Sequence, residues 1–309
     1  MQRLDGGSAV PPSWGGGIVA LGNFDGFHLG HQAVVARAVA AARDRGLPAL
    51  VATFDPHPRA FFRPDTPPFR LSTIEQRLRL FEAAGADAAV VFRFDAALAA
   101  LTAEDFVAER LTGLLRVAGV VTGEDFAFGR AKGGNVGMLA DLGRTGGFVA
   151  EAVAPVGLDG IAVSSSRIRD ALRDGRPGDA ARLLTRPFAV AGKVAHGDKV
   201  GRTIGYPTAN VAMGDYLRPA YGIYAVRGRL PDGTVLDGAA NLGIRPQFTP
   251  PKELLEPHFF DFAGDLYGQE IAVELIEYLR PEATFDGLPA LMAQMEADCA
   301  RARAILTSL

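Results

Sequence analysis

The chain has 309 residues, of which 48% are hydrophobic and 22% are charged. At roughly 150 residues per domain, this length predicts two domains with cores large enough to need no cross-links. The 32 basic and 35 acidic side chains leave a net charge of −3. This balance argues against nucleic acid or an anionic membrane as a partner, because both demand a strongly basic surface. The single cysteine excludes a disulfide framework and a cysteine-based zinc site.

The beginning of the chain does not have the pattern of a signal peptide. Residues 1–14 are polar and rich in Gly and Pro, and no run of 18 apolar residues occurs anywhere in the sequence. We therefore expect a cytoplasmic protein that spans no membrane. The scarcity of cysteine agrees with a reducing compartment.

The first half of the sequence alternates short apolar runs with segments of helical periodicity. Ser72 and Glu75 have the spacing of a capping box, and Ser164–Ser166 could cap a later helix. The alternation predicts an α/β Rossmann-like domain with a doubly wound parallel sheet over residues 1–185. The expected strands are 17–22, 49–54, 88–92, 117–122 and 148–153, and the expected helices are 30–45, 76–84, 102–115 and 167–173.

The second half has a different pattern, with short β-like runs separated by turns of Gly, Pro and Asp. No helical period intervenes before a final helix at 288–306. This pattern predicts a small antiparallel β-barrel domain with a C-terminal helix over residues 186–309. The expected strands are 189–195, 221–230, 235–241, 258–262 and 271–278.

Several common catalytic and nucleotide motifs are missing from the sequence. It contains no P-loop, no H-E-x-x-H, no G-x-S-x-G and no paired C-x-x-C. The run Gly15–Ala20 fits a loose dinucleotide fingerprint, but it precedes the first expected strand, whereas the fingerprint must follow a strand. We therefore do not interpret it as a cofactor site.

A His-x-x-His pair lies between the first expected strand and its helix. His28 and His31 stand at the mouth of a helix, whose free N–H groups attract phosphate, and Gly30 lets a phosphate approach the backbone. Donation of hydrogen bonds to a transferring phosphoryl group is the function that this pattern favours. The alternative is a pair of ordinary loop histidines at a helix start.

Three further polar segments follow other elements of the same half. Ser164–Arg169 brings hydroxyls and two arginines to a helix start, which suits a phosphate clamp, although it could be a plain capping sequence. Asp55–Arg59 and Gly123–Arg130 follow the second and fourth expected strands. Because ligands bind at the carboxyl ends of strands in open α/β sheets, we expect these elements to converge on one crevice.

The second half carries its own candidate site. Residues 194–202 are rich in glycine, so their backbone could wrap a phosphate. Thr208 and Asn210 offer two oxygen ligands suited to a hard cation such as Mg²⁺. A Gly/Pro turn with local side-chain to backbone bonds is the alternative interpretation.

The motifs occur in the order of a known family. GNFDGFHLGH, FDPHPR, GEDFAFGR and SSSRIR resemble the adenylyltransferase half of prokaryotic bifunctional riboflavin kinase/FMN adenylyltransferases, also called FAD synthetases. GYPTAN, YGIY, NLGIRP and the pair LE before DLYG are similar to the riboflavin kinase module. The resemblance extends from about Val19 to Arg303.

For the first half, the resemblance implies transfer of AMP from ATP to the phosphate of FMN, with release of pyrophosphate. His28 and His31 would contact the ATP phosphates as catalytic residues. Because the attacking phosphate is already an anion, no general base is needed. The implied ATP-binding residues are Asn23, Gly30, Ser164, Ser165, Arg167 and Arg169, and the implied flavin-binding residues are His57, Asp125, Phe126, Phe128 and Arg130.

For the second half, the resemblance implies phosphorylation of riboflavin by ATP. Glu256 would accept the proton of the 5′-hydroxyl, because an alcohol needs a base to become a nucleophile. Thr208 and Asn210 would hold Mg²⁺. The implied ATP-binding residues are Gly197, Gly201, Arg202, Pro207 and Thr208.

The sequence departs from the family pattern at four positions. Ser166 stands where the family usually has Thr, and Asn135 follows Gly134 where Gly-Asp is common. In the second half, Gln247 replaces the usual Thr, and Pro257 directly follows Glu256. Proline removes a backbone donor and restricts the residue before it to extended geometry.

Three alternative functions remain open. The chain could be a riboflavin kinase with an impaired adenylyltransferase half, or a flavin-binding regulatory protein without turnover. It could also be another adenylyl- or cytidylyltransferase or a relative of aminoacyl-tRNA synthetases. The near-neutral charge and the lack of a lysine-rich second signature argue against tRNA, and Gly205–Asn210 argues against the small-substrate transferases. The expected partners are therefore riboflavin, FMN and ATP, with the oligomeric state left open.

Overall fold

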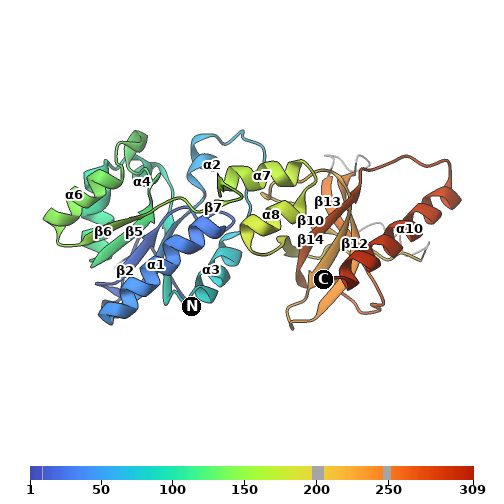
Figure 1. Cartoon of the computed structure of the whole chain (residues 1–309), viewed down its shortest axis with the longest axis horizontal. Helices are drawn as coiled ribbons and strands as arrows, with labels where there is room; N and C mark the ends of the chain where they lie inside the picture. Colours follow the sequence, from blue (N-terminus) through green and yellow to red (C-terminus); the bar gives the residue numbers. More distant parts are fainter. Residues whose placement is uncertain (9, 197–204, 246–251) are drawn as a thin grey trace. The chain divides into compact units, whose positions relative to one another are not determined.

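The computed structural model describes residues 1–8, 10–196, 205–245 and 252–309 (Figure 1). The chain divides into two compact units, and each is described by itself. The first unit comprises Met1–Thr66 and Thr73–Ser164, and the second comprises Pro67–Ser72 and Ser165–Leu309. The second unit thus includes two segments of the predicted first domain, Pro67–Ser72 and Ser165–Thr185. A functional boundary between 185 and 186 stays a prediction.

The first unit contains the expected doubly wound parallel sheet. Its strands are β1 (Gln2–Asp5), β2 (Ile18–Leu21), β3 (Ala49–Asp55), β4 (Ala88–Arg93), β5 (Gly119–Gly123) and β6 (Val149–Val153). They pair in parallel in the order β1-β4-β3-β2-β5-β6. Strand β1 was not expected, because its sequence is polar. It joins the sheet by pairing with β4, so that Gln2 lies opposite Ala88.

Helices cover both faces of this sheet, because successive residues of each strand point to opposite sides. In β2, Ile18 and Ala20 pack with α1 (Leu29–Arg45) and α3 (Ile74–Ala83). Val19 and Leu21 pack with the opposite layer. That layer consists of α4 (Ala96–Ala100), α5 (Ala103–Phe106), the π-helix η2 (Val107–Leu114) and α6 (Val136–Gly146). The helix expected at 102–115 is therefore α5 continued by a π-helical segment.

The shorter elements of the first unit connect these layers. They are the 3-10 turns η1 (Pro12–Trp14) and η3 (Arg130–Lys132), helix α2 (Pro58–Phe62), and the small hairpin of β7 (Gly157–Leu158) and β8 (Ile161–Ala162). Helix α2 follows the carboxyl end of β3, and the hairpin leads to the end of the unit at Ser164.

The second unit is an antiparallel barrel preceded by α7 (Ser165–Arg173) and α8 (Pro177–Leu184). Its strands are β9 (Phe188–Lys193), β10 (Val211–Ala212), β11 (Gly222–Arg229), β12 (Val235–Arg245), β13 (Lys252–Phe259) and β14 (Glu270–Arg280). They pair in the order β10-β13-β12-β11-β14-β9. A bridge between Ala195, just after β9, and Asn210, just before β10, joins the two edges of the sheet. The expected barrel is confirmed, and this bridge nearly closes it.

The C-terminal helix α10 (Leu288–Thr307) covers the outside of the barrel. Inside the barrel lie fully buried side chains from five strands: Val190, Tyr224, Leu242, Leu255 and Val273. On the outside, Ala302 and Leu306 of α10 pack against Ala225 and Ala239. The barrel therefore has an inner core and a second apolar layer under the helix.

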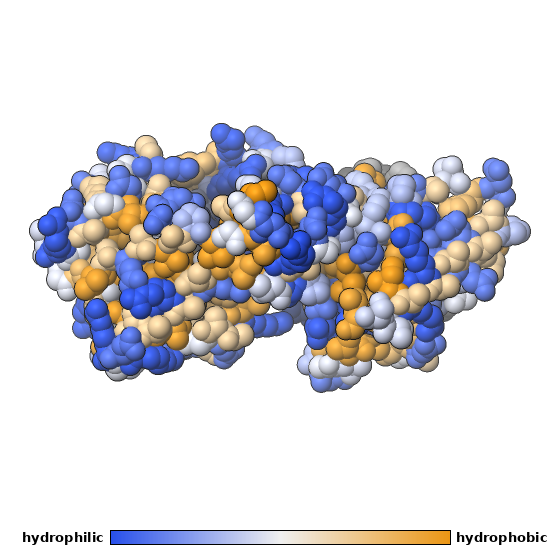
Figure 2. Space-filling view, viewed as in Figure 1, coloured by the Kyte–Doolittle hydropathy of each residue, from blue (hydrophilic) through white to orange (hydrophobic). Residues whose placement is uncertain are grey.

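The surface and the helices of the described residues give no sign of a membrane segment. On the face seen in Figure 2, hydrophilic residues are interspersed among hydrophobic ones. Among the residues that the structure describes, no helix is long and apolar enough to cross a bilayer.

The capping box before α3 lies one residue later than expected. Thr73 Oγ1 accepts from the Gln76 backbone N–H at 3.2 Å, and Gln76 Oε1 accepts from the Thr73 N–H at 2.9 Å. The expectation of Ser72 with Glu75 was therefore wrong. The sequence STIEQ allows both registers, and the buried face of the helix, which includes Ile74 and Phe81, selects the observed one.

We predict that Thr73→Ala lowers the free energy of unfolding of the first unit by about 1 kcal/mol, because it removes a helix N-cap. Urea unfolding followed by circular dichroism measures this change. Thr73→Ser should restore the stability, and Glu75→Gln should leave it unchanged. An equal loss from Thr73→Ala and Glu75→Gln would contradict the observed register of the cap.

Candidate active sites

The strand order of the first unit reverses between β2 and β5. From β2 the sheet grows through β3 and β4 in one direction and through β5 and β6 in the other. In open α/β sheets, ligands bind where the order of the strands reverses in this way. The segment Asn23–His31 follows β2, and Glu124–Arg130 follows β5. Two of the predicted site segments therefore lie at the point where the fold favours ligand binding.

The two histidines after β2 are packed tightly at the start of α1. His28 is the N-cap residue, and its side chain is only 6% exposed. Its ring stacks on that of His31, with centroids 3.6 Å apart and an interplanar angle of 19°. The Phe24 ring meets His31 edge-on at 5.3 Å. Both imidazoles are thus held in fixed orientations at the N-terminus of a helix, a position that suits the binding of phosphate.

Gly30 permits the close packing around His28. A Cβ atom at this position would lie 3.3 Å from Cε1 and 3.4 Å from Nδ1 of the His28 ring, and 3.8 Å from the Val163 carbonyl oxygen. A side chain would therefore crowd the imidazole. The contact with Val163 also brings the end of the first unit, at Ser164, near the start of α1.

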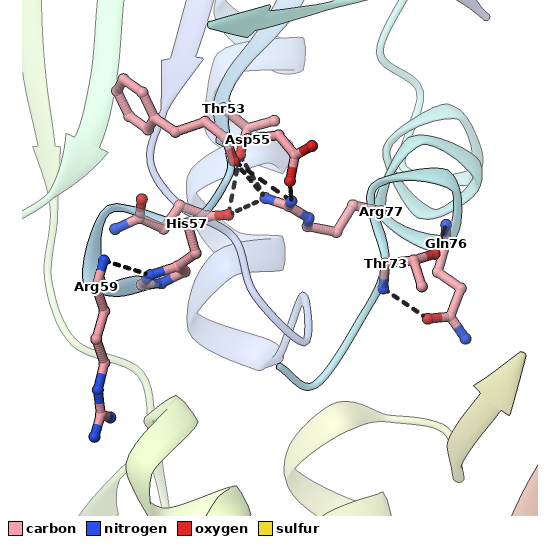
Figure 3. A network of polar contacts seen from close by, with 9 residues as sticks. Thr53, Asp55, His57, Arg59, Thr73, Gln76 and Arg77 are labelled. Carbon is pink, nitrogen blue, oxygen red and sulfur yellow. Dashed lines mark hydrogen bonds and ion pairs between the residues drawn. The ribbon is translucent and has the colours of Figure 1, made fainter. Parts of the chain in front are cut away.

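Asn23 combines an anchored backbone with an available side-chain acceptor. Its carbonyl oxygen accepts hydrogen bonds from Thr53 Oγ1 at 2.9 Å and from Arg77 Nη1 at 2.7 Å (Figure 3). Its Oδ1 atom is buried and has no hydrogen-bond partner among the described residues. A buried acceptor without a partner is costly, so a ligand that donates to this oxygen would stabilise the site.

The predicted Ser/Arg element opens helix α7 in the second unit. The helix already begins at Ser165, so the expected helix of 167–173 starts two residues earlier. Ser165 and Arg167 are partly buried. Arg169 is 8% exposed, and its Nε atom donates to the Phe69 carbonyl at 2.8 Å. Ser164 belongs to the first unit and the other three residues to the second, so convergence of all four on the histidines stays a prediction.

The residues predicted to bind flavin have very different degrees of burial. Asp125 and Arg130 are exposed, while Phe128 is a core residue that contacts the ring of Phe106 at 5.8 Å. Phe126 is partly buried and stacks on Phe128 with centroids 5.8 Å apart. Phe126 is therefore more accessible to a ligand than Phe128.

His57 is the N-cap residue of α2, where its Nδ1 atom accepts from the Arg59 backbone N–H at 3.0 Å (Figure 3). Beside it, an aromatic cluster that the sequence analysis missed extends from α2. Phe62 is 63% exposed, and its ring meets Phe94 edge-on at 5.7 Å. The sequence offered a weaker signal for this cluster than for the histidines: Phe54 lies in β3, and Phe61 and Phe62 follow the end of that strand within seven residues.

The unusual Asn135 has a clear structural role. It is the N-cap of α6, and its Oδ1 atom accepts from the Met138 N–H at 3.0 Å. Asn and Asp are equally good N-cap residues, so replacing the common Asp by Asn preserves this contact.

In the barrel, the strand register brings the second set of predicted residues together. Asn241 of β12 lies directly opposite Glu256 of β13, and Val211 of β10 lies opposite Leu255. The Ala209 N–H donates to the Pro257 carbonyl at 2.9 Å, which continues the second pairing. Asn210, between Ala209 and Val211, is therefore the cross-strand neighbour of Glu256.

The side chains of this row face away from the barrel interior. Val211, Leu255 and Leu242 are fully buried inside. Because side chains alternate along a strand, Asn210 and Glu256 project to the opposite side. Asn210 is nevertheless 8% exposed, since it lies at the bridge that closes the barrel.

Asn241 extends the row toward Glu282. Its Nδ2 atom donates to Glu282 Oε1 at 3.3 Å, whereas its Oδ1 atom is buried without a hydrogen-bond partner among the described residues. Gly243 makes room for Glu282, because a Cβ atom there would overlap Oε1 of that carboxylate. The row thus offers a second buried acceptor close to Glu256.

The segment before Asn210 continues alongside strand β13. The Pro207 carbonyl oxygen lies 2.9 Å from Nδ1 of His258, and the Tyr206 and His258 rings meet at 5.3 Å. Thr208 is partly buried between these contacts and Ala209. A hydroxyl and an amide oxygen, with a carboxylate next to them, are the hard donors that Mg²⁺ prefers when it also binds phosphates, so the residues present fit this ion.

Four predicted or unusual residues cannot be placed. Gly197, Gly201 and Arg202 lie outside the described residues, as does Gln247. Among the described residues, no group of three or more His, Cys, Asp or Glu side chains forms a metal cluster.

Pro257 is compatible with the strand that carries Glu256. Its carbonyl points toward Ala209, so its nitrogen points the same way and not toward β12. The ladder with β12 continues on both sides, from Lys252 to Phe259. The missing N–H therefore falls on the side of the short strand β10, where proline is tolerated.

A second carboxylate on β13, Glu253, is held by neighbouring side chains. Arg218 Nε donates to it at 2.6 Å, and the Tyr221 hydroxyl also donates to it. The hydrogen bond from Arg218 lowers the pKa of Glu253, while burial and the contact with Glu253 raise the pKa of Tyr221 to about 12. A carboxylate with a lowered pKa and occupied oxygens is a weak base, so Glu253 is a poor candidate for proton transfer.

Comparisons with known proteins match the two halves of the chain to two different families. Residues 10–167 match the family model described as FAD synthetase, and residues 184–306 match the model described as riboflavin kinase. The chain is 40% identical to the bifunctional riboflavin kinase/FMN adenylyltransferase of Pseudomonas fluorescens, covering 99% of this chain and 98% of the relative. It is 39% identical to the protein of the same name from Escherichia coli, with coverage of 93% and 92%.

A solved structure shares the fold of the whole chain. It is described as a macrolide-efflux protein from Streptococcus pneumoniae, with a TM-score of 0.86, 30% identity, and coverage of 96% of this chain and 97% of that one. Because both family models match and the identity extends over nearly the full length of the relatives, this chain belongs to the family of bifunctional riboflavin kinase/FMN adenylyltransferases.

Proposed function

We propose that the chain phosphorylates riboflavin with ATP to give FMN, and then transfers AMP from a second ATP to FMN to give FAD and pyrophosphate. The observation that carries this proposal is the match of each half to one of the two family models, with relatives that cover both. The absence of a membrane-spanning helix among the described residues and the single cysteine support a cytoplasmic location.

In the adenylyltransferase half, the chemistry requires charge stabilisation more than proton transfer. His28 and His31 donate hydrogen bonds to the phosphates of ATP, and the N–H groups at the start of α1 add to this field. Asn23 accepts from the bound nucleotide through its buried Oδ1 atom. Ser164, Ser165, Arg167 and Arg169 complete the ATP site, and the segment around Phe126 and the turn at His57 bind FMN.

In the kinase half, the riboflavin hydroxyl must lose its proton. Glu256 accepts this proton, and its cross-strand neighbours Asn210 and Asn241 orient the reacting groups. Mg²⁺, held by Thr208 and Asn210, supplies charge neutralisation at the ATP phosphates. Pro207 and the glycine-rich segment of Gly197, Gly201 and Arg202 bind the nucleotide.

The two reduced forms of this function receive little support. A kinase without adenylyl transfer was suggested by Asn135, but this residue caps α6 as an aspartate would. A flavin-binding protein without turnover was suggested by Pro257, which leaves the ladder with β12 intact. Separation of the flavins after incubation with riboflavin, Mg²⁺ and ATP distinguishes the full function from these two forms. The full function yields FAD, a kinase alone yields only FMN, and a binding protein yields neither.

We predict that His28→Ala lowers the rate of FAD formation from FMN by about 100-fold, because it removes a hydrogen-bond donor from a preorganised site. The rate of FMN formation from riboflavin should stay unchanged in the same preparation. Chromatography of the flavins measures both rates. Loss of both activities in a folded variant would contradict the assignment of two separate sites.

Asn210→Ala should have the opposite effect. FMN formation should fall by about 100-fold, because the variant loses an oxygen ligand for the cation. FAD formation from supplied FMN should continue at the original rate, and circular dichroism shows whether the barrel of the variant is folded. If raising the Mg²⁺ concentration leaves the variant and the original protein equally far apart, Asn210 does not act through the ion.

Glu256→Gln should lower kcat of the kinase by a factor of about 100 or more, because the amide cannot accept the proton. Its matched control is Glu270→Gln, an exposed position of the same barrel, which should leave kcat unchanged. Steady-state kinetics with riboflavin give both values. A Glu256→Gln enzyme with normal kcat would exclude this residue as the base.

A further inference from the structure

A buried arginine of α3 connects the two strand ends that border the first site. Arg77 is 2% exposed and was not expected from the motifs. We propose that Arg77 is a positioning residue for adenylyl transfer, holding the loop after β2 and the end of β3 in a fixed relation. The inference rests on the adenylyltransferase function proposed above.

On one side, Arg77 supports the loop that carries the histidines. Its Nη1 atom donates to the Asn23 carbonyl at 2.7 Å, and Thr53 Oγ1 donates to the same oxygen at 2.9 Å (Figure 3). Nη1 also donates to Thr53 Oγ1 at 2.9 Å, so the three groups form a closed triangle. The backbone oxygen of Asn23 is thus fixed from two directions, and with it the start of the loop.

This support matters because the loop adopts an unfavourable backbone conformation. Phe24 and Phe27 have positive φ angles of 52° and 42°, a region that residues with a Cβ atom rarely adopt. Their rings are buried and pack against Phe81, one turn beyond Arg77 on the same helix. Helix α3 therefore supports the loop twice, through an apolar contact and through the guanidinium.

On the other side, Arg77 contacts the end of β3. Its Nη1 and Nη2 atoms both lie 3.5 Å from the Phe54 carbonyl oxygen, and Nη2 lies 3.9 Å from Oδ1 of Asp55. Asp55 is the last residue of β3 and leads into the turn with His57, which belongs to the predicted flavin side. One guanidinium thus connects the nucleotide side and the flavin side of the site.

The contacts explain why a planar guanidinium suits this position. Arginine keeps its charge when buried and directs several N–H donors in a fixed fork, whereas the lysine ammonium is a compact point charge on a flexible stem. A lysine could reach the Asn23 carbonyl or the end of β3 but could not span both with the same geometry. We therefore expect the reaction to depend on the shape of the side chain and on its charge.

The experiment compares Arg77→Met, Arg77→Lys and Thr53→Val in the full chain. Arg77→Met should lower kcat for FAD formation from FMN and ATP by about 100-fold, because misplacement of a site by about 1 Å costs that much. KM for ATP should change far less. Arg77→Lys should recover part of kcat. Thr53→Val removes the hydroxyl that donates to the Asn23 carbonyl and accepts from Arg77, and it should lower kcat by about tenfold.

Riboflavin phosphorylation by the same preparations is the internal control, since its residues lie in the other unit and its rate should not change. Arg79→Met, at an exposed position of the same helix, is the matched control and should leave FAD formation unchanged. If Arg77→Met does not fold, Arg77→Lys and Thr53→Val decide the question. Unchanged kcat in both variants overturns the proposal, as does a loss carried entirely by KM for ATP. Absence of FAD formation by the original protein would instead overturn the proposed function.

Discussion

The parallel pairing of β2 with β3 on one side and β5 on the other is the constraint on which the first site depends. It reverses the order of the strands at β2, which is where open α/β sheets bind ligands at the carboxyl ends of their strands. The stacked pair of His28 and His31, the anchored Asn23 and the phenylalanines after β5 all begin at these strand ends. The covering helices stabilise the pairing from both faces, and α3 adds a buried guanidinium at its edge.

In the barrel, the corresponding constraint is the closure of the sheet between β9 and β10. An open antiparallel sheet would leave unpaired groups on β9 and β10, and the bridge from Ala195 to Asn210 joins these two edges. The residue that closes the barrel is also the neighbour of Glu256 across the strands. Closure and alignment of the reacting groups are therefore linked, since displacing Asn210 would disturb both.

Much of the fold could be predicted from the sequence, because alternation of apolar strands with amphipathic helices is a local signal. Strand β1 could not, since Gln2–Asp5 is polar and gains its structure only by pairing with β4. The capping box shifted from Ser72 to Thr73 because both registers satisfy the motif and only the packing of Ile74 separates them. Local patterns therefore identify elements more reliably than they identify the ends of elements.

For the candidate sites too, local sequence patterns identify some residues, while others depend on contacts between distant segments. The histidines beside Gly30 and the oxygen donors Thr208 and Asn210 could be selected as candidates from the sequence because their residue types and spacing suit a chemical role, which stays a prediction. Arg77 could not, because its role depends on carbonyl oxygens from segments far away in the sequence. One hint existed, since Arg77 occupies the apolar face of α3 between Ile74 and Phe81, where an exposed arginine would not fit. The row of Asn210, Glu256 and Asn241 likewise depends on strand register, which the sequence does not specify.

The two reactions differ in whether the nucleophile needs a general base. Riboflavin attacks with an alcohol, which remains protonated at neutral pH, so the reaction needs a carboxylate as a base, the role proposed for Glu256. FMN attacks with a phosphate whose second pKa is about 6, so it is already largely a dianion. The proposed first site accordingly needs only hydrogen-bond donors and helix N–H groups, and the buried guanidinium of Arg77 is turned toward backbone oxygens. The product of the barrel thus carries the charge that lets the sheet domain work without a base.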